Sequence, residues 1–120
     1  MEVIIQDGYE SISSQAAHIV AQTLNAKPDA VLGLATGSTP LGLYKELIRM
    51  HQQEGLDFSQ VTTFNLDEYV GLPKQHSQSY HYFMHENLFK HINISEQNIY
   101  IPSGTTSNYQ AFCEWYEQRI

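Results

Sequence analysis

Apolar residues recur at two different spacings along the chain, and their alternation predicts strands and helices in turn. The short β-branched run at residues 3–5 predicts a first strand. From about residue 9 to 26, apolar positions return every three or four residues, which indicates an amphipathic helix. Asp7 and Glu10 have the spacing of a capping box at the start of that helix.

The middle of the chain repeats the same order. Residues 30–35 are apolar without polar alternation, which favours a strand buried on both faces, as in a parallel sheet. A second helix should follow, with Thr39 as its N-cap, Pro40 as its first residue and Gly55 as its stop.

Two further strand–helix units complete the pattern. Strands are expected at 61–66 and 98–101, and Ser79 and Asn108 are candidate caps of the helices that follow them. Alternating strands and helices predict an α/β fold: a Rossmann-like parallel sheet with right-handed crossovers and helices on both faces. The last helical pattern reaches Ile120 without a stop signal. We therefore expect residues 1–120 to be the N-terminal part of a larger single domain, truncated at its C-terminus.

Composition narrows the possible partners. Six Lys and Arg against thirteen Asp and Glu give a net charge of −7, which argues against nucleic acid and anionic membrane as partners. Cys113 is the only cysteine, so no internal disulfide can form, and its helical position predicts a core residue. The N-terminus has neither the basic stretch nor the long apolar run of a signal peptide, which predicts a cytoplasmic protein.

The turn at residues 36–39 joins a predicted buried strand to a helix N-terminus. Free N–H groups, a glycine and three hydroxyl side chains make such a turn suited to binding a phosphate, although a plain connecting turn has the same pattern. Asp67 and Glu68 directly follow the next strand, and ligands of open α/β sheets bind beyond the carboxyl ends of strands. A carboxylate there could abstract a proton beside a carbonyl, bind a metal or cap a helix, and we expect only one of the two to face the crevice.

The histidines offer a weaker signal. His81 and His85 are four residues apart on one helix, a metal-ligand spacing, but no third ligand is evident. We therefore expect no metal and place both on an exposed helix face. His76, in the loop after Asp67, could border the crevice.

Two motifs together closely resemble the glucosamine-6-phosphate deaminase family. They are Leu-Gly-Leu-Ala-Thr-Gly-Ser-Thr-Pro at 32–40 and Thr-Phe-Asn-Leu-Asp-Glu-Tyr-Val-Gly-Leu at 63–72, and the match continues to residues 116–117. The resemblance implies conversion of glucosamine 6-phosphate and water to fructose 6-phosphate and ammonium, in N-acetylglucosamine catabolism, with no metal or organic cofactor. We class this activity as isomerase-like and as that of a hydrolase.

The resemblance also implies residue roles. Asp67 would take the C2 proton of the ring-opened sugar and return it at C1, and Glu68 would neighbour the site. The substrate phosphate would be held by Thr36, Gly37, Ser38 and Thr39.

The family's ring-opening histidine segment and its phosphate-binding cations have no counterpart in residues 1–120, so these residues alone should be inactive. Two alternatives stay open: a 6-phosphogluconolactonase-like hydrolase, which would share the phosphate loop, and a non-catalytic sugar-phosphate sensor domain.

Overall fold

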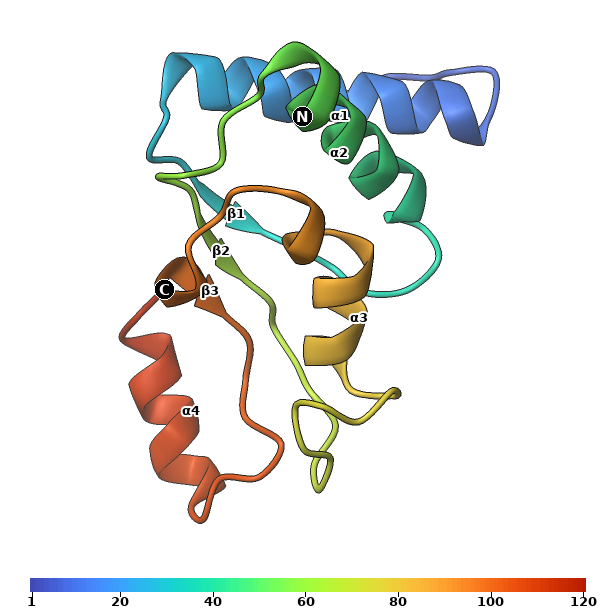
Figure 1. The fold of residues 1–120 in the computed structure, drawn as a ribbon. Coiled ribbons are helices and arrows are strands. Elements are labelled where there is room, and N and C mark those ends of the chain that lie inside the picture. The colour runs from blue at the N-terminus through green and yellow to red at the C-terminus, as the bar shows by residue number, and fades with distance from the viewer.

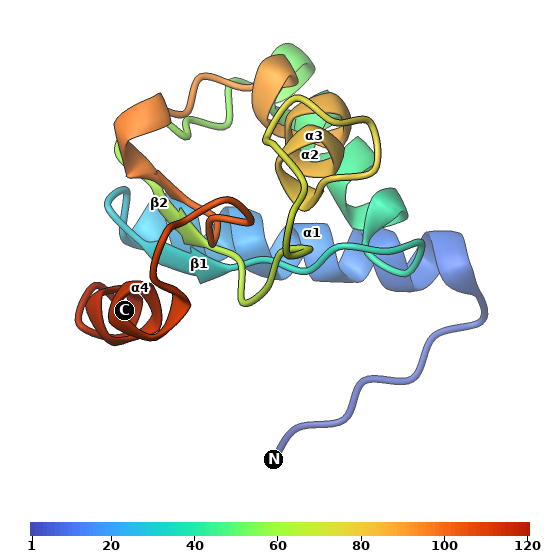
Figure 2. The ribbon, with the colours of Figure 1, turned by 90° about the horizontal axis from the view of Figure 1, so that it is seen from below.

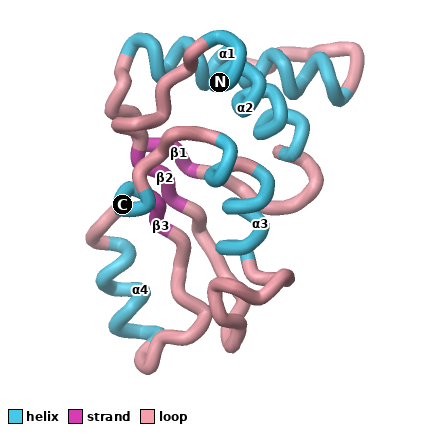
Figure 3. Tube along the Cα trace, viewed as in Figure 1, coloured by secondary structure: helices cyan, strands magenta, loops and turns pink.

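Three parallel strands form the centre of the computed structural model, which describes residues 1–120 (Figure 1). The sheet order is β1-β2-β3, and the strands are short relative to the loops that follow them (Figure 3). Two 3-10 turns, Phe89–His91 and Glu96–Asn98, lie between α3 and β3. The main elements are α1 (Tyr9–Ala26), β1 (Val31–Gly33), α2 (Leu41–Glu54), β2 (Thr62–Phe64), α3 (Tyr80–Asn87), β3 (Ile99–Tyr100) and α4 (Tyr109–Glu117).

Helices cover both faces of the sheet, as the alternating pattern predicts. The helices α2 and α3 lie on one side and α4 on the other (Figure 2), while α1 packs against α2. None of the helices is both long and apolar enough to cross a bilayer. The core lies between the sheet and α1, α2 and α3, and its largest fully buried apolar side chains are Tyr44, Leu47, Phe58, Val61, Met84 and Leu88.

The opposite face of the sheet is held by aromatic contacts with α4. Phe64 of β2 stacks on Tyr100 of β3 at 4.6 Å between ring centroids, and Tyr116 meets Phe64 edge-on at 5.9 Å. The Tyr116 hydroxyl lies 2.6 Å from the Asn65 carbonyl oxygen and 2.9 Å from that of Tyr100, and donates to them. Burial raises the pKa of Tyr116 to about 12, so this hydroxyl remains a donor across the ordinary pH range.

Several details of the predicted elements are wrong. Residues 3–5 form no strand and are exposed, because no neighbouring strand offers them a ladder. Gly8, not Asp7, precedes α1, and no side chain caps that helix. The strand β1 is not buried on both faces: Val31 is 61% exposed, since it shares a face with Phe64 that α4 covers only over β2 and β3.

The helix ends follow the sequence signals more closely. Gly55 ends α2 in the left-handed conformation (φ 74°), and the side chains of Ser79 and Asn108 accept from the backbone of the helices they begin. Pro40, however, is the N-cap of α2 instead of its first residue, because its carbonyl already accepts from Tyr44 N. Cys113 is exposed on α4 and is not a core residue, since only the Tyr116 side of that helix reaches the sheet.

Replacing Tyr116 by phenylalanine tests the link between α4 and the sheet. The variant leaves the buried Asn65 carbonyl without this donor, whereas that of Tyr100 still accepts from Asn65 N. The free energy of unfolding should therefore fall by about 1–3 kcal/mol in urea titrations. The matched control is Tyr109→Phe, which also removes a hydroxyl bound to a backbone carbonyl (Gly104, 3.0 Å) but at a 42% exposed side chain. Equal losses in the two variants would contradict this role of Tyr116.

Candidate functional site

The pairing of β1 with β2 brings the two predicted site segments to one edge of the sheet. Beyond the strands, Leu34 N donates to Phe64 O and Asn65 Nδ2 donates to Leu34 O, both at 2.9 Å. Asn65 is 1% exposed, so this side chain fixes the distance between the strand ends in a dry environment. The turn at 36–39 and the segment at 67–69 begin from these two linked ends.

The turn at 36–39 has backbone N–H groups that are not used in hydrogen bonds within the chain. Gly37 has a positive φ of 96°, and Ala35 O at the start of the turn accepts from the buried Tyr44 hydroxyl. The amide N–H groups of residues 36–39 donate to no group in the chain. Free amides next to a helix N-terminus attract an anion, because the N–H dipoles and the helix dipole point the same way.

A cavity of about 300 Å³ separates this turn from the start of α3. Tyr69 and Tyr80 stand together on its far side, with ring centroids 4.8 Å apart. Interaction with the Tyr69 side chain raises the pKa of Tyr80, and the nearby charge of Asp67 contributes in the same direction. The position of Tyr80 in the first turn of α3 directs its side chain to this cavity. The walls are Thr36, Gly37, Tyr69, Ser77, Gln78, Ser79, Tyr80 and Phe83.

Asp67 and Glu68 lie in different surroundings. The Glu68 side chain is 1% exposed, whereas Asp67 is exposed. The Glu68 carboxylate accepts from the backbone N–H of Tyr69 (2.8 Å), Tyr80 (2.8 Å) and His81 (3.0 Å). Glu68 therefore closes the N-terminus of α3, the capping role that the sequence left open for either acid, whereas no hydrogen bond or ion pair within the chain engages the Asp67 carboxylate.

The Glu68 carboxylate also binds the imidazole of His81 (Nδ1 to Oε2, 2.7 Å). The prediction of an exposed helix face is wrong for His81, which is 8% exposed, because Glu68 gives its ring a buried partner. Burial lowers the pKa of His81 and outweighs the opposing effect of Glu68, so at neutral pH the ring is uncharged and donates from Nδ1. Burial raises the pKa of Glu68, but the hydrogen bonds outweigh it and lower the pKa below its usual value.

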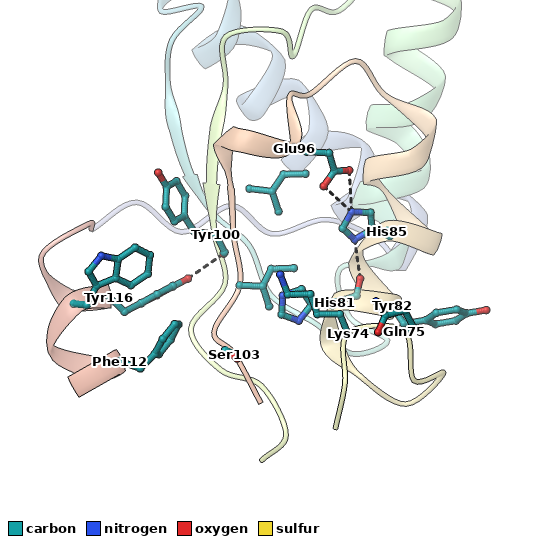
Figure 4. Close-up of a pocket in the computed structure, with 13 residues that line it drawn as sticks. Lys74, Gln75, His81, Tyr82, His85, Glu96, Tyr100, Ser103, Phe112 and Tyr116 are labelled. Atoms are coloured by element: carbon teal, nitrogen blue, oxygen red, sulfur yellow. Dashed lines mark hydrogen bonds and ion pairs between the residues drawn. The ribbon is translucent and has the colours of Figure 1, made fainter. Parts of the chain in front are cut away.

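The remaining histidines do not assemble a metal centre. His85 contacts His81 O and the exposed Glu96, and no group of three or more His, Cys, Asp or Glu side chains could hold a metal ion. His76 is exposed and accepts from Gln78 N at the rim, without lining the 300 Å³ cavity. A separate cavity of about 560 Å³ lies between α3, β3 and α4 and contains neither Asp67 nor the turn at 36–39 (Figure 4).

Comparison with known proteins identifies the family of this chain. The profile of the family described as glucosamine-6-phosphate isomerases/6-phosphogluconolactonase matches residues 6–120. The chain belongs to this family. It is 54% identical over 120 residues to the glucosamine-6-phosphate deaminase of Thermoanaerobacter sp. (strain X514) and 52% identical to that of Clostridium botulinum (strain Loch Maree / Type A3). All of this chain aligns, with 47% and 49% of those proteins, so it spans about half the length of these relatives.

Among solved structures, a deaminase matches this chain more closely than a 6-phosphogluconolactonase does. A monomeric glucosamine-6-phosphate deaminase superposes with a TM-score of 0.96 at 48% identity, covering 99% of this chain and 49% of that one. The 6-phosphogluconolactonase from Thermotoga maritima gives 0.69 at 23% identity, over 97% of this chain and 51% of that one, a likeness of fold alone. The resemblance inferred from the motifs is confirmed. The classification as a hydrolase is wrong, because the proteins about half identical to this chain are named glucosamine-6-phosphate deaminases.

The pair formed by Glu68 and His81 predicts how stability depends on pH. His81 has a lowered pKa, so unfolding should become easier as the pH falls below 6.5, where an unfolded histidine takes a proton. Glu68 also has a lowered pKa, so its contribution is present above 4.5 and is lost as the pH falls through its folded value. Urea unfolding between pH 7 and 4 should show the free energy of unfolding falling across both ranges.

The variant Glu68→Gln separates the two contributions. It should lower the free energy of unfolding at pH 7 by about 1–3 kcal/mol, because one amide oxygen cannot replace a carboxylate with four bonds, and flatten the dependence below pH 4.5. The control Glu96→Gln removes a carboxylate whose side chain is 76% exposed at its contact with His85, and should change little. A Glu68→Gln variant as stable as Glu96→Gln would contradict the capping role.

Proposed function

We propose that the protein containing these residues converts glucosamine 6-phosphate and water to fructose 6-phosphate and ammonium. One observation carries the proposal: free backbone donors at 36–39 and a free carboxylate at Asp67 follow strands that are hydrogen-bonded to one another. Relatives about half identical to this chain and named as deaminases support the choice of reaction.

The turn at 36–39 is suited to the substrate phosphate. Its amides point to no group of the chain, and Thr36, Ser38 and Thr39 add hydroxyl donors. Lys45, one turn into α2, borders a separate cavity with Tyr9, Ser38 and Thr39 that does not include Thr36 or Gly37. A phosphate dianion bound here would leave the sugar carbons extending toward the 67–69 segment.

Asp67 is suited to the proton transfers. Its carboxylate can take the C2 proton of the open-chain aldehyde, which the neighbouring carbonyl acidifies, and so form an enolamine. Return of that proton at C1 leaves an imine at C2, and water then releases ammonia and forms the ketone. A single base reaches C1 and C2 when both lie along the same face of the sugar. Residues 1–120 supply no evident group for ring opening or for full neutralisation of the phosphate, and we expect these residues alone to be inactive.

Replacing Asp67 by asparagine tests the proton-transfer role. In the intact protein, kcat for ammonium release should fall by about 10²–10⁴-fold, since an amide cannot accept the C2 proton, while the fold is kept. Glu68→Gln should lose less turnover, because Glu68 holds the start of α3 and not the substrate. Wild-type turnover in Asp67→Asn, or a larger loss in Glu68→Gln, would show that the wrong carboxylate is assigned.

Acid release from 6-phosphogluconolactone in place of ammonium release would assign the protein to the hydrolase branch. Binding of the sugar phosphate without either reaction would assign it to a sensor.

Replacing Gly37 by alanine tests the phosphate role. A Cβ at this position meets no protein atom within 4 Å and would occupy the space proposed for the phosphate, so KM for glucosamine 6-phosphate should rise about tenfold. Gly55→Ala is the matched control, because Gly55 also has a positive φ (74°) and open space, at the far end of α2. It imposes similar backbone strain and should leave KM unchanged. A KM that is equal in both variants would refute phosphate binding at the turn.

A further inference from the structure

We propose that Tyr9 is a positioning residue that holds the 36–39 turn in its anion-binding shape; this inference rests on the proposed function of that turn. Tyr9 is the first residue of α1, 29 positions before Ser38. Its hydroxyl lies 3.0 Å from Ser38 O and 3.1 Å from Thr39 O, and accepts a hydrogen bond from Gly42 N at 2.7 Å. One side chain from another helix thus joins the end of the turn to the first turn of α2.

The direction of the Ser38 carbonyl fixes the direction of an amide. A peptide unit is planar and trans, so the carbonyl of one residue and the N–H of the next point opposite ways. With Ser38 O turned toward Tyr9, the Thr39 N–H is turned away from α1. At the other end of the turn, the Tyr44 hydroxyl holds Ala35 O in the same manner and turns the Thr36 N–H outward. The two tyrosines therefore orient the first and last free amides of the turn.

The helices α1 and α2 pack closely at Gly42, which allows Tyr9 to reach the start of α2. A Cβ at Gly42 would overlap Ser13 Oγ and approach Tyr9 Cε1 to 2.8 Å. Glycine inside a helix is disfavoured relative to alanine, so its use here has a local reason in the close approach of the two helices. Gly42 thus provides both the space for the Tyr9 ring and the N–H that its oxygen accepts.

The contact should affect binding of the phosphate and not the proton transfers. Tyr9 contacts the end of the turn and the start of α2, whereas Asp67 lies beyond β2, in the segment that contains the buried side chains of Asn65 and Glu68. Loss of the hydroxyl would leave Ser38 O held only by Leu41 N at 3.3 Å. The Thr39 amide would then be less firmly oriented, which weakens an anion site that depends on prearranged donors. A residue of merely structural importance would not separate KM from kcat in this way.

Tyr9→Phe in the intact protein is the direct test. We expect KM for glucosamine 6-phosphate and the inhibition constant of inorganic phosphate each to rise about fivefold, equal to ~1 kcal/mol, with kcat within about twofold of wild type. Gly42→Ala should raise both constants as well, because its Cβ displaces Tyr9, and the two changes combined should be less than additive. Tyr109→Phe is the matched control, an exposed first residue of a helix whose hydroxyl binds a backbone carbonyl at 3.0 Å. It should leave both constants unchanged.

The outcomes separate this inference from the function beneath it. If the wild-type protein releases ammonium but Tyr9→Phe leaves KM and the inhibition constant of phosphate unchanged, the positioning role alone is overturned. This holds even if Tyr9→Phe lowers the melting temperature. Equal rises in Tyr9→Phe and Tyr109→Phe would also overturn it. A wild-type protein that neither releases ammonium nor is bound by phosphate would overturn the proposed function and this inference together.

Discussion

Parallel pairing of β1 with β2 is the constraint on which the rest of the site depends. The two strands are only three residues long, but their hydrogen bonds continue past the ladder through Leu34 N to Phe64 O and through the Asn65 side chain to Leu34 O. Asn65 is almost fully buried, so water cannot easily replace the hydrogen bond that its side-chain amide donates. Because parallel strands end at the same edge, residues 31 positions apart in sequence meet there.

Around that edge, some backbone groups are hydrogen-bonded within the chain and others are left free. The carbonyl groups of Ala35, Ser38 and Thr39 face tyrosine hydroxyls, and the amides of the 36–39 turn are left free. At the 67–69 segment, the buried Glu68 satisfies the N-terminus of α3 and thereby leaves Asp67 as the unengaged acid. Adjacent carboxylates thus lie in opposite surroundings, one in a dry hydrogen-bonded pocket and one facing water.

Much of this arrangement could be predicted from the sequence, since the signals are local. Gly55, Ser79 and Asn108 end or begin helices by the chemistry of their own side chains or backbone. The unalternating apolar run around β1 correctly indicated a parallel sheet.

The predictions that failed concern residues whose environment depends on tertiary contacts. The 3–5 run lacks a neighbouring strand, Val31 lacks a covering helix, and His81 is buried only because Glu68 reaches it from 13 residues away. Tyr80 contacts Tyr69, and Tyr9 contacts the 36–39 turn. The spacing of residues within their own helices does not predict either contact. The metal-free character of the chemistry and the cytoplasmic location stay predictions.

The most direct test is a crystal structure of the intact protein carrying Asp67→Asn, with glucosamine 6-phosphate bound in its open-chain form. The account predicts phosphate oxygens about 2.7–3.2 Å from the amide nitrogens of the 36–39 turn, with C2 of the sugar facing the side chain at position 67. Phosphate bound away from that turn, or a sugar whose C1 and C2 lie beyond reach of position 67, would contradict it.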